Sequence, residues 1–402
     1  MIISALQSKI LFISTYSPSK CGIASFTEDL VNAINPIIKG NYSIGICALG
    51  KQGTLKEYSF PVSEVMDGYQ FDSCIESAEL INSDPSVELV CIEHEFGLYG
   101  GELGEYLLGF LSLLDKPFVI RFHTVLPDPD QKRLKIVQAI ASLAEKIIVM
   151  TENSSRLLRK DYQVHAEKIT IIPHGTHAIS KYRAEDLKIK YELEDKLVLT
   201  TFGLLSPNKG IEKGILAMKE ISANIPDAIY IILGQTHPNL LQQEGEKYRD
   251  YLQQLINDNN LQQNVRLVNE YIPIQKLMEY LALTDIYLFT SKDPNQAVSG
   301  TFLYAMSAGC AIISNAFVLA EEMLDEHTGV ILKTGDVQEL AENAIRLLRN
   351  KSIRTQMGSR AFMKTNNSIW KNVAAKHVEL FNKILGRPAR KPEYLTRLSV
   401  NQ

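Results

Sequence analysis

The residue types best suited to bind an anion stand at Ser299, Gly300 and Thr301, which open a helical segment at 302–308 after a strand-like run at 286–290. A helix N-terminus presents unpaired N–H groups and the positive end of the helix dipole, and both favour a phosphate. The alternative is an ordinary helix start that Ser299 or Thr301 caps. In open α/β sheets, a loop at the carboxyl end of a strand is where ligands bind, so an anion site is predicted here.

A second candidate anion site lies at Lys209, in the loop that follows the strand-like run at 197–202. A lysine beside free N–H groups at a helix start meets a phosphate as a point charge, whereas the alternative is a solvated side chain. Gly22 and Gly234 follow other strand-like runs, where a glycine lets the backbone approach a ligand closely. For both glycines a plain turn is the alternative.

The loop after the strand-like run at 89–93 combines carboxylates, a histidine and glycines: Glu93, His94, Glu95, Gly97, Gly100 and Gly101. Because neighbouring residues of a strand point to opposite faces, Glu93 and Glu95 share one side and His94 takes the other. No third metal ligand has a convincing spacing, so acceptors for sugar hydroxyls are the favoured interpretation. A solvated turn remains the alternative.

Two further histidines stand at the ends of strand-like runs. His123 follows the run at 118–122, where ligands bind, although a structural role is the alternative. His174 lies near the end of the first series of strand-like runs. It either faces a cleft or shapes a turn, and the sequence leaves both interpretations open. Asp128 and Asp130 match a metal-binding DxD pattern in letters only, because the flanking prolines predict a turn.

The chain has 402 residues, 45% hydrophobic and 22% charged, and a formal net charge of −4. The length favours two or three globular domains, and the charge gives no basis for nucleic-acid binding. The N-terminal apolar run predicts a strand and not a signal peptide, and no apolar run approaches the ~20 residues of a membrane span. The five scattered cysteines form no CxxC pair, so we expect a cytoplasmic protein without a zinc site or disulfides.

Short apolar runs alternate with helical patterns along the chain, which predicts parallel sheets with helices on both faces. The first series of strand-like runs covers residues 10–14, 43–48, 89–93, 118–122, 146–150 and 170–172. The second covers residues 197–202, 229–233, 265–268, 286–290, 311–314 and 330–332. Helices are expected between them, among others at 25–34, 104–114, 131–143, 210–223, 246–257, 274–283 and 337–350. Two series of similar size predict an α/β protein with two doubly wound domains, joined by a polar link at 175–192.

Taken together, the loops resemble those of glycosyltransferase family 4, retaining enzymes of the GT-B fold. The matching pieces are the Gly22 loop, FHT at 122–124, IPHG at 172–175, FGLLSPNKGIE at 202–212, LGQTHP at 233–238 and AMSAGCAIIS at 305–314. The set spans almost the whole chain in the family's order. The resemblance implies two Rossmann-like domains facing across a cleft: an acceptor domain at 1–176, on which a last helix at 368–385 packs back, and a donor domain at 177–367. Residues 386–402 would be a basic tail.

Carried over by position, the resemblance implies that Lys209 binds the phosphates of a nucleotide-sugar and that His123 contacts the transferred sugar, so these are the expected catalytic residues. The expected donor-binding set is Gly22, Asn208, Lys209, Gly234, Gln296, Ser299, Gly300, Thr301 and Tyr304. The expected acceptor-binding set is Glu93, His94, Glu95, Gly97, Gly100, Gly101 and His174. No metal or other cofactor is implied, because a lysine and backbone dipoles stabilise the leaving phosphate.

The chain departs from the family at three positions. Leu204 replaces an arginine whose fork of donors suits phosphate, and Gln296 and Tyr304 replace a pair of glutamates that hold the sugar and the ribose. Gln296 can still hydrogen-bond a sugar, whereas Tyr304 is not a carboxylate acceptor. These departures indicate a divergent subgroup.

The leading hypothesis is therefore a metal-independent transfer from a nucleotide-sugar to a saccharide or glycoconjugate, for example in surface polysaccharide biosynthesis. A glycoside phosphorylase that uses phosphate or a sugar 1-phosphate is the first alternative, because the ribose carboxylate is missing. A non-catalytic sugar-binding protein on the same fold is the second. A weak peripheral membrane contact is a further possibility, because the expected helix at 131–143 carries Lys132, Arg133 and Lys135; the alternative is a solvated helix face. The sequence does not indicate the oligomeric state.

Overall fold

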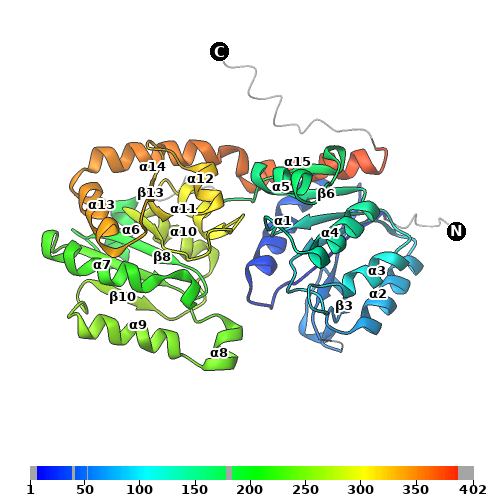
Figure 1. Cartoon of the computed structure of the whole chain (residues 1–402), viewed down its shortest axis with the longest axis horizontal. Helices are drawn as coiled ribbons and strands as arrows, with labels where there is room; N and C mark the ends of the chain where they lie inside the picture. The colour runs from blue at the N-terminus through cyan, green and yellow to red at the C-terminus, as the bar shows by residue number, and fades with distance from the viewer. Residues whose placement is uncertain (1–6, 39–40, 52, 178–182, 388–402) are drawn as a thin grey trace, which may run out of the picture. The chain divides into compact units, whose positions relative to one another are not determined.

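The chain folds into two compact α/β units. The computed structural model describes residues 7–387 except 39–40, 52 and 178–182. The first unit comprises Met1–Gly175 with Trp370–Gln402, and the second comprises Thr176–Ile369 (Figure 1). The division falls at the start of the predicted link. Part of that link is helical, because Ala184–Lys190 forms helix α6, which packs on α10 (Ile274–Ala282).

The first unit is built on a seven-stranded parallel sheet with the order β3-β2-β1-β4-β5-β6-β7. Its strands are β1 Lys9–Ser14, β2 Ser43–Leu49, β3 Val62–Met66, β4 Val87–His94, β5 Phe118–Phe122, β6 Lys146–Val149 and β7 Ile169–Ile171. The central strands are almost wholly buried, which is why their sequences are continuous apolar runs.

Helices cover both faces of this sheet (Figure 1): α1 Gly22–Ile38, α2 Phe71–Ser83, α3 Tyr106–Leu113, α4 Gln131–Leu143, α5 Glu152–Lys160 and α15 Trp370–Ile384. The last helix begins and ends within the predicted range of 368–385. It packs on α1, and its Phe381 lies edge-on to Phe12 of β1 with ring centroids 6.2 Å apart. The C-terminal helix is therefore part of the core of the first unit.

The second unit contains a six-stranded parallel sheet with the order β10-β9-β8-β11-β12-β13. Its strands are β8 Leu197–Phe202, β9 Ala228–Leu233, β10 Val265–Val268, β11 Ile286–Phe289, β12 Ala311–Asn315 and β13 Val330–Leu332. Besides α6 and α10, its helices are α7 Ile211–Asn224, α8 Pro238–Glu244, α9 Lys247–Asp258, α11 Gly300–Ser307, α12 Val318–Met323, α13 Val337–Arg349 and α14 Lys351–Thr365. The α/β prediction with two parallel sheets is thus confirmed.

Two separate hydrophobic clusters cover the two faces of this second sheet. One contains buried residues of α7, α9 and α13, and the other contains buried residues of α6, α10, α11 and α12. In both units the strands are parallel, so their carboxyl ends meet at one edge, and most of the predicted site residues follow these ends. Among the described residues, none of the helices is long and apolar enough to cross a membrane.

Candidate functional site

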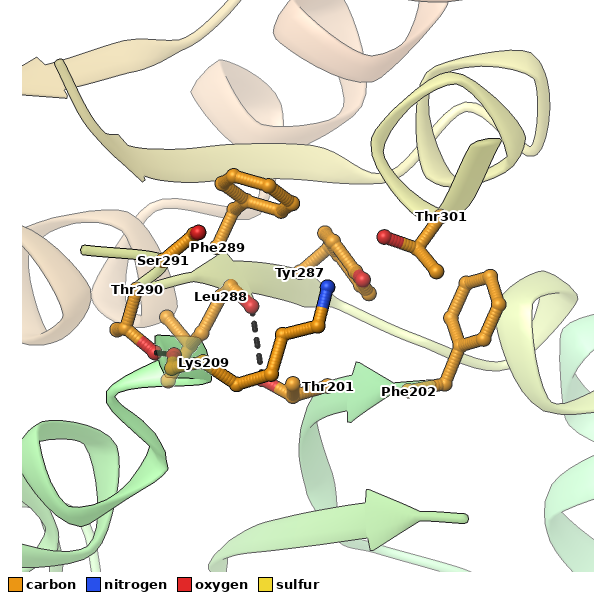
Figure 2. Close-up of a pocket in the computed structure, with 9 residues that line it drawn as sticks. All are labelled: Thr201, Phe202, Lys209, Tyr287, Leu288, Phe289, Thr290, Ser291 and Thr301. Carbon is orange, nitrogen blue, oxygen red and sulfur yellow. Dashed lines mark hydrogen bonds between the residues drawn. The ribbon is translucent and has the colours of Figure 1, made fainter. Parts of the chain in front are cut away.

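A small, open cavity lies at the carboxyl ends of β8 and β11 in the second unit. Its lining residues are Thr201, Phe202, Lys209, Tyr287, Leu288, Phe289, Thr290, Ser291 and Thr301. Figure 2 shows the Lys209 side chain extending into this space on the side of Tyr287 and Thr301. The structure thus brings together Lys209 and Thr301, which the sequence assigned to one phosphate site.

A short 3₁₀ turn, Pro207–Lys209, fixes the backbone of Lys209. Thr290 at the end of β11 donates a hydrogen bond from Oγ1 to the Lys209 carbonyl over 2.8 Å. Gly210 closes the turn with φ 61°, and a Cβ there would lie 2.4 Å from the Thr290 carbonyl oxygen. Only glycine fits this close approach, so the turn holds Lys209 at the sheet edge.

The ammonium group of Lys209 is partly desolvated, and within the described chain it forms no ion pair. Burial lowers its pKa from the ordinary lysine value, because a charge in a low-dielectric site is disfavoured. An anion placed in the cavity would supply the missing counter-charge. Asn208, the preceding residue, is exposed, and its carbonyl accepts a hydrogen bond from the Lys292 N–H over 2.8 Å.

Helix α11 begins beside this cavity and is capped by Ser299. The Ser299 Oγ accepts a hydrogen bond from the Phe302 N–H over 3.4 Å and lies 3.1 Å from the Thr301 Oγ1. The capping alternative is therefore realised for Ser299, which is only 4% exposed. Within the described chain, the N–H groups of Gly300 and Thr301 donate to no acceptor, so they remain available to an anion.

Gly234 allows the loops after β8 and β9 to lie against each other. It adopts φ +142°, and a Cβ there would lie 1.9 Å from the Gly203 carbonyl oxygen. The two loops are also joined by hydrogen bonds from Leu205 N to Gln235 O and from His237 N to Leu205 O, both 2.9 Å long. Gly234 is therefore required for the loop packing, whether or not it also touches a ligand.

Gln296 and Tyr304, which the family resemblance aligns with a pair of glutamates, both make contacts within the second unit. Gln296 donates from Nε2 to the Val298 carbonyl over 3.0 Å. The ring of Tyr304 is 9% exposed, stacks on Phe202 with centroids 6.4 Å apart, and meets His177 edge-on. The aromatic ring thus occupies the position where the family resemblance would place a carboxylate.

The sequence reasoning missed two residues near Lys209. Tyr287 is fully buried, and its hydroxyl faces Thr301 without a well-formed hydrogen bond, while burial keeps its pKa raised and the group protonated. Burial, and after it the charge of Lys209, lower the pKa of His237. A polar-tipped residue inside the otherwise aliphatic run 286–288 was the available signal for Tyr287.

In the first unit, His123 stands in a buried ionic cluster. Its Nε2 lies 2.7 Å from Glu93 Oε2, and the other carboxylate oxygen of Glu93 accepts a hydrogen bond from Arg121 over 2.5 Å. Glu93 and Arg121 are 0% exposed. The prediction that Glu93 binds a sugar directly is therefore wrong for this structure, because both of its oxygens are buried and occupied.

His94 and His174 are also buried. His94 is 0% exposed among Phe96, Tyr99 and Phe122, and burial, followed by the charge of His123, lowers its pKa to about 3. The structure contradicts the assignment of His94 to sugar binding, because the alternation of side chains along β4 directs it into the core.

His174 is 8% exposed and packs against Phe26 and Trp370. Its Nδ1 lies 2.7 Å from the Gly175 carbonyl, and burial lowers its pKa to about 4. His174 therefore shapes the turn after the last strand of the first unit. The alternative in which it faces a cleft is not supported.

The remaining loop residues differ in how open they are. Glu95 is half-buried and accepts a hydrogen bond from Thr124 Oγ1 over 2.6 Å. Gly97 and Gly22 are open, because a Cβ at either position meets nothing within 4 Å. A Cβ on Gly100 would lie 2.5 Å from the Tyr106 ring, and one on Gly101 would lie 2.4 Å from Glu105. Gly100 and Gly101 thus serve local packing, which leaves Glu95 and Gly97 as the accessible part of the loop.

The other charged features have structural partners. Asp130 caps α4 by accepting a hydrogen bond from the Arg133 N–H over 2.8 Å. Lys132 is ion-paired with Glu102 and Glu105, so the basic face of α4 is partly neutralised. Throughout the part of the chain that the structure describes, groups of three or more His, Cys, Asp or Glu side chains placed to hold a metal ion are absent.

The second unit is similar to a known family of enzymes. The family model of the glycosyl transferases group 1 matches residues 183–363, which lie within the unit that contains Lys209 and α11. This match supports the resemblance read from the sequence within residues 183–363, whereas the family of the whole chain and the roles of Gln296 and Tyr304 stay predictions.

Individual relatives are distant. An uncharacterized glycosyltransferase of Methanocaldococcus jannaschii is 24% identical over 62% of this chain and 61% of its own length. The phosphatidylinositol N-acetylglucosaminyltransferase GPI3 subunit of Saccharomyces cerevisiae is 26% identical over 60% of this chain and 48% of its own length. The matched region thus spans only about half to three-fifths of these two relatives.

A solved structure shows the fold over nearly the whole chain. HepE of Anabaena, in complex with UDP and glucose, has a TM-score of 0.70 and 19% identity, over 94% of this chain and 100% of its own. This likeness establishes the GT-B arrangement of two Rossmann-like folds and not a shared substrate.

Proposed function

Because residues 183–363 match the family model of the glycosyl transferases group 1, we propose that this protein is a retaining glycosyltransferase that moves a sugar from a nucleotide-sugar to a saccharide or glycoconjugate acceptor. The observation that carries the proposal is the geometry around Lys209: its desolvated ammonium group has no counter-ion among the described residues and faces the start of α11. The HepE structure, which contains UDP and glucose, supports a nucleoside diphosphate as the leaving group.

In the proposed reaction, the bond between the anomeric carbon and the diphosphate oxygen breaks, and the acceptor hydroxyl attacks the anomeric carbon from the same face. The hydroxyl proton passes to the leaving phosphate oxygen, so no protein base is required. Lys209 and the N–H groups of Gly300 and Thr301 stabilise the charge that develops on this phosphate, without a metal ion. His123 contacts the transferred sugar, and Glu95 and Gly97 belong to the acceptor site.

The test is a panel of UDP- and GDP-sugars mixed with the full chain, with binding followed by calorimetry and slow donor hydrolysis followed by NMR. The proposal expects at least one donor to bind and to be hydrolysed. Absence of both binding and hydrolysis across the panel would contradict it.

The packing of Tyr304 favours a second candidate function. Because its ring stacks on Phe202 where a ribose carboxylate would stand, a glycoside phosphorylase that uses phosphate or a sugar 1-phosphate is the alternative. Release of sugar 1-phosphate from an oligosaccharide only in the presence of phosphate would support the phosphorylase, and strict dependence on a nucleotide would exclude it. Sugar binding without any turnover would instead indicate a non-catalytic protein.

A further inference from the structure

A chain of buried hydrogen bonds connects His123 to the C-terminal helix. Arg121 NH1 donates to Glu93 Oε1 over 2.5 Å, and its NH2 group contacts His377 Nε2 on α15. Glu93 Oε2 lies 2.7 Å from His123 Nε2. Glu93, Arg121 and His377 are each 0% exposed, so water does not compete for these contacts.

The direction of each hydrogen bond follows from the chemistry of its partners. A guanidinium group can only donate, so His377 Nε2 must accept and its proton must lie on Nδ1. His377 Nδ1 is 2.7 Å from the Val373 carbonyl, which accepts this proton. Burial, together with the charge of Arg121, holds the pKa of His377 well below its ordinary value, which agrees with a neutral ring.

Glu93 determines the proton on His123 in the same way. Burial alone would raise the pKa of Glu93, but Arg121 and the hydrogen bond of His123 outweigh burial and lower it. An ionised carboxylate can only accept, so His123 must carry a proton on Nε2. Its Nδ1 then forms no hydrogen bond within the described chain, while the side chain keeps 12% of its surface exposed.

We propose that Glu93 is a positioning residue: it fixes the Nε2–H tautomer of His123 and thereby leaves Nδ1 as an acceptor for a hydroxyl group of the transferred sugar. Arg121 offsets the charge of Glu93, and His377 fixes the Arg121 fork, so the orientation of His123 depends on α15. The hydroxyl contact rests on the proposed function, whereas the tautomer does not. Phe26 limits ring movement from the side, since its ring is edge-on to His123 at 5.2 Å.

The alternative is that Glu93 and Arg121 only join β4 to β5, as a buried ion pair would in any sheet. The two roles differ in what they do to His123. A purely structural pair affects stability, whereas a positioning pair also sets the proton distribution of the imidazole ring and the preference for a hydroxyl-bearing sugar.

The experiment uses the full chain and compares the wild type with Glu93→Gln and Glu88→Gln. Glu88 provides the matched control, because it lies on the same strand and forms an ion pair with Arg387 away from His123. Long-range ¹⁵N–¹H NMR spectra assign the tautomer of His123. Transfer is measured with the active nucleotide-sugar and with its monodeoxy analogues.

In the wild type we expect the Nε2–H tautomer and a penalty of about 10- to 100-fold in kcat/KM for the one deoxy analogue that lacks the contacted hydroxyl. Glu93→Gln should give a mixture of tautomers and lose most of that penalty, because an amide can accept or donate. Glu88→Gln should leave both unchanged. A higher donor concentration should restore neither the Nε2–H tautomer nor the deoxy penalty in Glu93→Gln.

Two results would overturn the proposal: a proton on Nδ1 of His123 in the wild type, in the neutral ring or in the imidazolium form, or a Glu93→Gln variant with unaltered tautomer and deoxy penalty. The wild-type spectrum decides the first point even where Glu93→Gln fails to fold. An Nε2–H tautomer in a protein that turns over no donor would refute the proposed function and leave the assignment of Glu93 standing.

Discussion

At the scale of single residues, Lys209 carries the most specific prediction. Its ammonium group is desolvated and lacks a counter-ion within the described chain, so a bound diphosphate should form a charge-assisted contact worth about 1.5–3 kcal/mol. Lys209→Ala should therefore weaken binding of the active nucleoside diphosphate by about 10- to 100-fold, measured by calorimetry, with a similar loss in kcat/KM.

Lys219 is the matched control for this change, because it is exposed on α7 in the same unit. Lys219→Ala should bind the nucleotide like the wild type. Equal affinity of Lys209→Ala and wild type would show that the phosphates bind elsewhere.

His94 allows a prediction about acid stability. Its pKa is about 3 in the folded protein, whereas it has the ordinary value of 6.5 in an unfolded chain. Between these values the unfolded state binds more protons, so stability is lost as the pH falls below about 6.5, by up to about 1.4 kcal/mol per pH unit for this group. His174, with a pKa of about 4, acts in the same direction.

The variant His94→Leu should reduce that slope by up to about 1.4 kcal/mol per pH unit between pH 6 and 4, because it removes the group that takes up a proton on unfolding. The exchange costs no hydrogen bond among the described residues, since neither ring nitrogen of His94 has a partner there. Urea unfolding at several pH values, followed by fluorescence, measures it. Trp370 is the only tryptophan and is 6% exposed in the first unit, so the signal reports this unit. An unchanged slope, or loss of sugar transfer at full stability, would contradict the structural role.

Residue identity in the sequence was enough to single out Lys209 and His123 but not the state of their neighbours. Glu93 was predicted to bind sugar hydroxyls, since alternation along a strand gives a side and not a partner. Its partner Arg121 lies 28 positions away along the chain. His377, which contacts Arg121, lies a further 256 positions away, and only the fold brings the three residues together.

At the scale of elements, the loops after β8 and β9 depend on Gly234. Gly234→Ala would place a Cβ 1.9 Å from the Gly203 carbonyl oxygen, in a backbone conformation with φ +142°. Such strain costs on the order of 1–3 kcal/mol. We expect a lower melting temperature of the second unit and weaker nucleotide binding, measured by calorimetric melting with and without nucleotide.

Gly97→Ala serves as the control for stability, because a Cβ there meets nothing within 4 Å. It should melt like the wild type. A melting temperature of Gly234→Ala equal to that of the wild type would contradict the prediction, because it would mean that the loops after β8 and β9 can move apart without loss of stability.

Several element ranges were predictable from the sequence alone. The predicted ranges of β5, β8, β10, β13 and α4 agree with the structure. Among them β10 and β13 are edge strands, so an edge position did not prevent the prediction. Strand β3 was missed because two adjacent polar residues, Ser63 and Glu64, interrupt its apolar pattern. Helix α11 starts two residues before the predicted 302, because the cap at Ser299 sets its first turn.

At the scale of the whole molecule, the alternation of strands and helices was sufficient to predict two parallel sheets. The order of the strands was not predictable, because it depends on contacts between distant segments. The same holds for the last helix: its apolar pattern predicts a helix, whereas its place in the first unit rests on contacts with β1, α1 and Arg121.

A chain that ends at Ile369 tests this dependence. Without α15, Phe12 loses the ring of Phe381, and Arg121 loses its acceptor on His377. A lost hydrogen-bond acceptor and an exposed apolar face both destabilise, so the first unit should lose its cooperative structure and the second should keep it. Amide hydrogen exchange, read separately on peptides from β1 and β4 and from β8 and β11, measures the two units.

The control is a chain that ends at Arg387, which keeps α15 and the contacts of Arg387 with Ser8 and Glu88. Its exchange should match that of the full chain in both units. Equal protection of β1 in both truncated chains would mean that α15 is dispensable. Equal loss in β1 and β8 would mean that the second unit also needs this helix. Only selective loss of protection in the first unit agrees with a core in which residues 9–14 and 370–384 pack as one body.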